Sequence, residues 1–114
     1  MSNKIKTFNI KSDLPTTEEA GRRLAEIIRE YKGKEKVIKI IHGYGSTGVG
    51  GNIKYLVHKS LKKRVRENNI KAYIPGEALS KLMGFDEIIY RYKHLIKDDS
   101  DYKKGNDGIT YIIF

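Results

Sequence analysis

The 114-residue chain has no cysteine, no long apolar run and no internal repeat, and each absence excludes some classes of protein or site. Without cysteine, disulfides, zinc–thiolate sites and thiol chemistry are excluded. No apolar run approaches the roughly 20 residues that a membrane-spanning helix needs, so we expect no membrane partner. Residues 1–6 are polar and basic with no apolar segment after them, which predicts no secretory signal and a cytoplasmic location. With 39% hydrophobic and 32% charged residues, the sequence is typical of one globular domain over residues 1–114.

Acidic residues are few relative to basic ones. The chain has 23 Lys and Arg against 14 Asp and Glu, which gives a formal net charge of +9. Such a charge attracts polyanions, although many small proteins are basic for solubility alone. Its distribution favours a binding role, because the stretch 54–71 follows a glycine-rich segment and contains a single acid, Glu67. The basic residues of this stretch are Lys54, Lys59, Lys62, Lys63, Arg64, Arg66 and Lys71.

Hydrophobic patterning predicts strands at residues 7–11, 36–41, 70–74 and 109–114. Two main helices separate the first three strands, and shorter helical segments at 78–83 and 86–96 lie in an insert at 75–104. The order is therefore β-α-β-α-β, helical insert, β. This order predicts an α/β fold: a two-layer sandwich with a mixed sheet of about four strands, in which the strands joined by helices pair in parallel.

The two main helices have recognisable ends. Thr16 and Glu19 have the spacing of a capping box at the start of the first helix, and Gly33 ends it. Asn52 is the expected cap of the second helix, and the asparagines at 68–69 close it.

The segment between the second strand and the second helix, residues 42–51, reads HGYGSTGVGG. A strand followed by glycines and a helix start is an arrangement that builds an anion site. The first helical amides have no internal partner, the helix dipole adds positive charge, and glycine lets the backbone approach a phosphate. Lys54 follows in the first turn and reaches toward the same anion. The candidate residues of this phosphate-binding loop are Gly43, Tyr44, Gly45, Ser46, Thr47, Gly48, Gly50 and Gly51.

Other interpretations of the loop stay open. Gly43, Gly45 and Gly48 spell the G-x-G-x-x-G dinucleotide fingerprint, but the acid expected about 20 residues later is absent. A P-loop is excluded, because no Lys-Ser or Lys-Thr pair closes the motif. The loop can also be a surface connection whose glycines satisfy turn geometry alone.

The stretch 40–61, IIHGYGSTGVGGNIKYLVHKSL, resembles the small MutS-related (Smr) domain family. That family has an apolar strand ending in His-Gly, a second glycine cluster and a helix with a Val-x-x-x-Leu pattern. The segment 16–24 (TTEEAGRRL) looks like its first helix, and 105–114 (GNDGITYIIF) is similar to its closing Gly-x-Gly-x-Thr strand. The positions that fall on the central pattern are His42, Gly43, Gly45, Gly48, Ile53, Lys54, Val57 and Leu61.

The resemblance implies a two-layer α/β fold that binds DNA or RNA, and several members of the family are endonucleases. In those members, catalysis depends on an Asp-Leu-His element in the first strand. Here the matching segment is Asn9-Ile10-Lys11, so an amide replaces the carboxylate and an amine replaces the imidazole. Neither Asn9 nor Lys11 is a general base at neutral pH without a large pKa shift, whereas Lys11 suits phosphate contact.

Single residues around the loop add to this hypothesis. His42 ends a central strand and is the candidate acid/base or orienting group, the alternative being a strand-end histidine bonded to backbone carbonyls. Lys54, Lys62 and Arg66 are expected to project from one side of the second helix, away from its buried stripe. His58, one turn past Lys54, extends this basic surface, the alternative being an ordinary solvated position. Tyr44 and Tyr55 are candidates for stacking on unpaired bases, the alternative for Tyr55 being packing against the sheet. Glu77 is a weaker candidate for a metal ligand or base, and the acids at 98–101 are expected to form a solvated turn.

We therefore hold nucleic-acid binding, to DNA or RNA, as the main hypothesis. An endonuclease that uses His42 is the first alternative, and a small nucleotide-binding protein is the second. Only the nuclease hypothesis calls for a cofactor, Mg²⁺.

Overall fold

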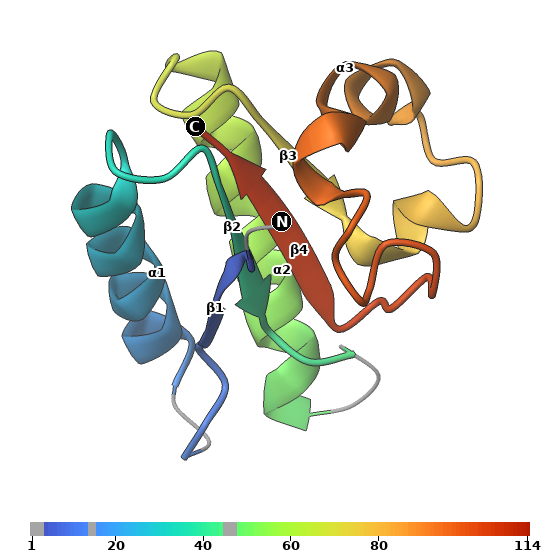
Figure 1. The fold of residues 1–114 in the computed structure, drawn as a ribbon. Coiled ribbons are helices and arrows are strands. Elements are labelled where there is room, and N and C mark those ends of the chain that lie inside the picture. The colour runs from blue at the N-terminus through green and yellow to red at the C-terminus, as the bar shows by residue number, and fades with distance from the viewer. Residues whose placement is uncertain (1–3, 14–15, 45–47) are drawn as a thin grey trace.

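A computed structural model describes residues 4–13, 16–44 and 48–114, with the side chains of 48–51 left aside. The elements, in chain order, are β1 (Lys6–Asn9), α1 (Thr17–Tyr31), β2 (Val37–Ile41), α2 (Gly48–Arg66), β3 (Ala72–Pro75), the 3₁₀ helix η1 (Gly76–Leu79), α3 (Asp86–Ile96) and β4 (Ile109–Ile113). Figure 1 shows the four strands between α1 and α2 on one side and α3 on the other. The predicted α/β fold with a mixed four-stranded sheet is confirmed. No helix in the described part of the chain is long and apolar enough to cross a membrane.

The strands follow the order β1-β2-β4-β3 across the sheet. β1 and β2 pair in parallel, as expected for strands joined by a helix, but the same expectation is wrong for β2 and β3. β4 lies between them and pairs antiparallel with both. All five residues of β4 are buried, which fits a central position, whereas Pro75 in β3 cannot donate to a ladder and fits an edge.

The two main helices pack together on one face of the sheet. Leu24 and Ile28 of α1 and Val57 and Leu61 of α2 are at most 1% exposed, and their cluster includes Ile112 of β4. The capping prediction for α1 is confirmed, because the Glu19 N–H donates to Thr16 Oγ1 at 3.1 Å.

The second face is covered over β2, β3 and β4 by α3 and the chain around it. Ile96 of α3 packs in a cluster with Ile74, Tyr111 and Ile113. The expected helix at 86–96 is confirmed, but the one at 78–83 is wrong, since only η1 forms there. Leu82 is 84% exposed, so no packed apolar face supports a further helical turn.

A buried lysine ties the segment after α3 to this second face. Lys39, in the middle of β2, is 6% exposed, and its Nζ donates to Asp99 Oδ2 and Asp101 Oδ2 at 2.8 Å each. The Tyr111 hydroxyl donates to the same Asp99 oxygen at 2.6 Å. The prediction of a solvated acidic turn is therefore wrong for Asp99 and Asp101. The Lys39 ammonium is buried, and a buried charge is costly unless it is paired. The two carboxylates therefore lie against it instead of in solvent.

Removing this ammonium is expected to destabilise the protein. Lys39→Met leaves two partly buried carboxylates unpaired, which costs about 3–5 kcal/mol at neutral pH in urea unfolding. Burial opposes ionisation of Asp99, but the hydrogen bonds from Lys39 and Tyr111 outweigh it and hold its pKa below the usual 3.8. The stabilisation by Asp99 is thus present above pH 3.8 and is lost as the pH falls through the lowered pKa, so the deficit of the variant should shrink in acid. Exposed Lys36→Met is the control, with an expected change within about 0.5 kcal/mol; equal effects of the two variants would contradict the buried pairing.

Candidate nucleic-acid interface

The predicted site lies at one edge of the sheet. β1 and β2 both end there, β4 begins there, and the connection from β2 leads into the first turn of α2 (Figure 1, lower edge). Ligands of α/β folds commonly bind at such an edge, beyond the carboxyl ends of parallel strands. Of the predicted loop, Gly45, Ser46 and Thr47 lie outside the described residues.

The last glycines of the predicted loop belong to α2. Gly48, Gly50 and Gly51 form its first turn, where backbone amides have no acceptor within the helix and the helix dipole is positive. Asn52 therefore lies inside the helix, and the prediction that it is the cap is wrong, because the helix starts four residues earlier. Free amides at the start of a helix are groups that commonly bind phosphate.

Gly43 turns the chain out of β2 instead of presenting its amide. Its φ of +87° favours glycine, and its N–H donates to the Gly108 carbonyl at 3.1 Å. The His42 N–H donates to the same carbonyl at 3.0 Å. The amide of Gly43 is thus bonded inside the fold and is not free for an anion. The absence of a side chain at this position still lets a ligand approach the backbone.

Lys11 lies directly over this turn. A Cβ built on Gly43 would be 3.0 Å from Lys11 Cδ, so a side chain at position 43 would displace the lysine. The segment that carries Lys11 is fixed by Arg23 of α1, whose Nη1 donates to the Ile10 and Ser12 carbonyls at 3.3 and 2.9 Å. Exposed Lys11 is therefore held beside the start of the glycine-rich loop.

His42 is completely buried, and both of its ring nitrogens have partners. Nδ1 lies 2.8 Å from the Gly43 carbonyl and Nε2 lies 2.8 Å from Thr110 Oγ1. A carbonyl can only accept, so Nδ1 carries the proton and Nε2 accepts from the Thr110 hydroxyl. Burial lowers the pKa of His42 to about 4 and keeps the ring neutral at pH 7. Through these two contacts, His42 fixes the end of β2 against β4. A catalytic role of His42 stays a prediction.

His58 of α2 extends the same chain of hydrogen bonds. Its Nε2 lies 3.1 Å from Thr110 Oγ1. Because the Thr110 hydrogen points to His42, His58 must donate through Nε2. Thr110 thereby joins the end of β2 to α2, a link that the sequence reasoning missed; the signal available was a polar residue within an apolar closing strand.

Lys54 does not share the exposed side of α2 with Lys62 and Arg66, so the prediction that the three project together is wrong. Its Nζ donates to Glu77 Oε2 at 2.6 Å, and its side chain is 17% exposed. Burial opposes ionisation of Glu77, but the hydrogen bond from Lys54 outweighs it and lowers the pKa of the carboxyl. Glu77 Oε1 is buried without a partner among the described residues.

The exposed side of α2 is basic and aromatic. No Asp or Glu occurs in its 19 residues. Tyr55 is 70% exposed in the helix, and Tyr44 is 65% exposed where the loop begins. The exposed cations of the helix are Lys59, Lys62, Lys63 and Arg66.

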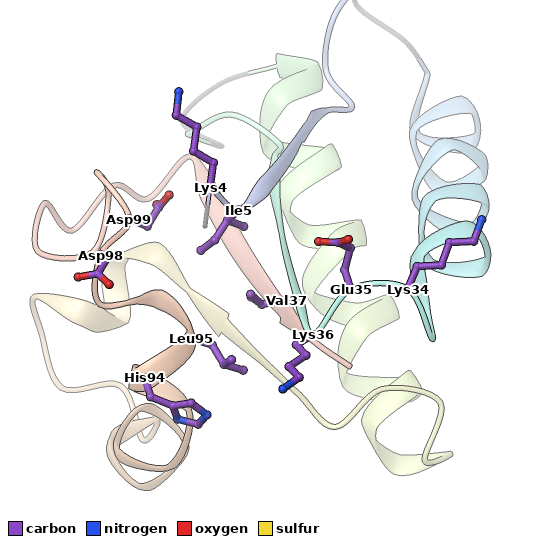
Figure 2. A pocket seen from close by; sticks show the side chains of 10 residues that line it. All are labelled: Lys4, Ile5, Lys34, Glu35, Lys36, Val37, His94, Leu95, Asp98 and Asp99. Atoms are coloured by element: carbon purple, nitrogen blue, oxygen red, sulfur yellow. The ribbon is translucent and has the colours of Figure 1, made fainter. Parts of the chain in front are cut away.

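A hollow of about 400 Å³ lies away from this interface, at the amino ends of β1 and β2 (Figure 2). Val37, Ile5 and Leu95 line it together with cations and acids. Figure 2 shows lysines and acidic side chains together around the hollow, so it does not gather a charge of one sign.

No triplet of His, Cys, Asp or Glu in residues 4–13, 16–44 and 48–114 is arranged to hold a metal ion. The chain matches no protein-family model, and neither curated proteins nor solved structures gave a match.

Burial of neutral His42 predicts a loss of stability in weak acid. The unfolded chain takes up this proton near pH 6.5 and the folded chain only near pH 4, so the stability from the neutral ring is complete above pH 6.5 and is lost as the pH falls toward 4. The expected loss is up to about 3 kcal/mol, at about 1.4 kcal/mol per pH unit, measured by urea unfolding across this range. His42→Gln should lower stability at pH 7 and flatten the profile, whereas exposed His94→Gln should keep the wild-type profile. A ring of His42 that titrates near pH 6.5 by NMR would refute the assignment.

Proposed function

We propose that the protein binds nucleic acid along the exposed side of α2, next to the glycine-rich turn. The observation that carries the proposal is the charge of this helix, which has no acid and presents four exposed cations on one side. A surface helix for solubility alone has no need to exclude acids, and such helices commonly mix both signs. The resemblance to the Smr domain family supports the same function.

The spacing of the cations suits a phosphate backbone. Lys59 and Arg66 are two turns apart, so the row extends over about 10 Å of helix axis. Neighbouring phosphates of one strand are separated by about 3.4 Å along a duplex axis, so the row can contact more than one of them. The first turn of α2 and Lys11 add positive potential at the loop end of the row.

The site residues favour binding over cleavage. Asn9 and Lys11 stand where the resembled nucleases have a carboxylate and an imidazole. Both nitrogens of His42 are bonded inside the fold, and Lys54 is neutralised by Glu77. Among the described residues of this edge, a phosphate would thus meet cations and backbone amides, while the ring nitrogens of His42 are already bonded.

The two exposed tyrosines favour a strand with unpaired bases. An aromatic ring stacks on any base that is not already stacked in a duplex, and each such contact is worth about 1–3 kcal/mol. Tyr44 lies against the backbone at Gly108, since a Cβ on this glycine would be 3.4 Å from Tyr44 Cε1. This contact limits the freedom of the ring while 65% of the residue stays exposed.

Neutralising the row should weaken binding and its salt dependence. For single-stranded RNA, the slope of log K against log salt concentration is about −0.7 per phosphate contact, so Lys59→Gln/Lys62→Gln should make the slope shallower by about 1.4. Fluorescence-anisotropy titrations of labelled polyuridylate over a range of salt concentrations measure this slope. Lys81→Gln/Lys103→Gln, with the same loss of charge away from α2, should keep the wild-type slope. The same complexes, incubated with and without Mg²⁺, reveal any cleavage.

A wild-type protein that binds no polynucleotide at low ionic strength would overturn the proposal. Equal slopes for both double variants would show instead that the net charge, and not the row on α2, attracts the ligand.

Removing the tyrosine rings should reduce the preference for unpaired bases. Tyr44→Ala/Tyr55→Ala is expected to weaken binding of single-stranded RNA by tenfold or more, since two stacking contacts of about 1–3 kcal/mol are lost. Binding of a duplex of the same length should change little. Tyr44→Phe/Tyr55→Phe keeps the rings and should behave as the wild type. An equal effect of the alanine variant on both ligands would refute stacking.

A further inference from the structure

The surface over η1 and α3 carries the most exposed large apolar side chains in the described part of the chain. Leu82 is 84% exposed and Tyr90 is 82% exposed. Neither lies on α2 or near the glycine-rich turn, and the proposed nucleic-acid interface uses neither. A soluble domain that exposes neighbouring large apolar residues commonly uses them in an interaction.

These two side chains border an open groove of about 640 Å³. The groove is lined by Ala78 and Leu79 of η1 and by Ile89 of α3. Two of these, Leu79 and Ile89, also pack against the core cluster of this face. The groove is thus floored by residues that the fold holds in place and bordered by residues that the fold leaves in solvent. This combination suits the docking of apolar side chains from a partner.

The border of the groove is positively charged. Lys81, Lys93 and Lys103 line it against one acid, Asp86. All three lysines are exposed and make no salt bridge within the described residues. A ligand with apolar anchors and carboxylates beside them would complement both the floor and the border.

We propose that this groove binds an acidic segment of another protein, one that inserts leucine-like side chains between Leu82 and Tyr90. The net charge of +9 opposes a second copy of this chain as the occupant, because the same charge would be brought together on both sides. Tyr90 and the lysines offer contacts to a polynucleotide as well, but a polynucleotide has no aliphatic group to fill the floor of Ala78, Leu79 and Ile89, so a segment with apolar anchors fits the groove better. The proposal does not depend on the function proposed for α2.

The first test measures binding of a synthetic peptide by fluorescence anisotropy and NMR. The labelled peptide carries leucine at i, i+3, i+4 and i+7 and glutamate at the other positions, and the control peptide has serine in place of leucine. The leucine peptide should bind and shift the amide signals of residues 78–82 and 89–93, and the serine peptide should bind at least tenfold more weakly. Equal affinity of both peptides would overturn the proposal, because it would reveal a charge effect alone.

The second test uses surface variants. Leu82→Ser/Tyr90→Ser and Lys81→Glu/Lys93→Glu should each weaken peptide binding about tenfold or more, which is about 1.4 kcal/mol. Lys59→Glu/Lys62→Glu on α2 makes the same charge change elsewhere and should leave peptide binding within twofold while polynucleotide binding falls. Unchanged peptide affinity in the groove variants would overturn the proposal. Binding of polyuridylate and of anionic vesicles is measured for the same variants. If Leu82→Ser/Tyr90→Ser weakens either of these more than it weakens peptide binding, the groove serves another ligand and the proposal is overturned.

Discussion

The position of β4 between β2 and β3 is the constraint on which the rest of the structure depends. No pairing joins β2 to β3, so the β1-β2 pair and β3 belong to one sheet only through the two antiparallel ladders of β4. Alternation along β4 then serves both faces. Thr110 and Ile112 point to α1 and α2, whereas Tyr111 and Ile113 point to the cluster with α3.

Two neighbouring residues of β4 each hold a polar network on a different face of the sheet. Thr110 links His42 to His58 on the helix side, and Tyr111 bonds Asp99, which pairs with Lys39, on the other side. A shift of register by one residue would exchange the faces of all these side chains and leave each network without its central hydroxyl. The end of β2 with α2, where we propose nucleic-acid binding, and the segment after α3 are therefore both positioned by β4, although they lie on opposite faces of the sheet.

The sequence predicts those features that local patterns encode. The Thr16 cap, α3 and the four strands follow from spacing of a few residues, and the turn at Gly43 follows from the glycines after β2. Features that depend on partners far along the chain were missed or wrong. In the sequence, Lys39 is a charged residue within an apolar strand, and nothing near it explains its presence. Its partner Asp99 lies 60 residues later and comes beside it only in the folded chain. Likewise, the Lys54 side chain turns away from the exposed side of α2 because it pairs with Glu77, which lies 23 residues later in another element.

A sheet whose central strand follows all its other strands in the sequence has a consequence for synthesis on the ribosome. The segments from β1 to α3 emerge first, and until β4 follows, β2 and β3 each expose a strand edge that has no partner. The nascent chain can form its helices and the β1-β2 pair early, but the remaining contacts are distant in sequence and form slowly. Formation of this sheet is thus coupled to the synthesis of β4, and the interval before that strand appears is when the chain is most exposed to aggregation.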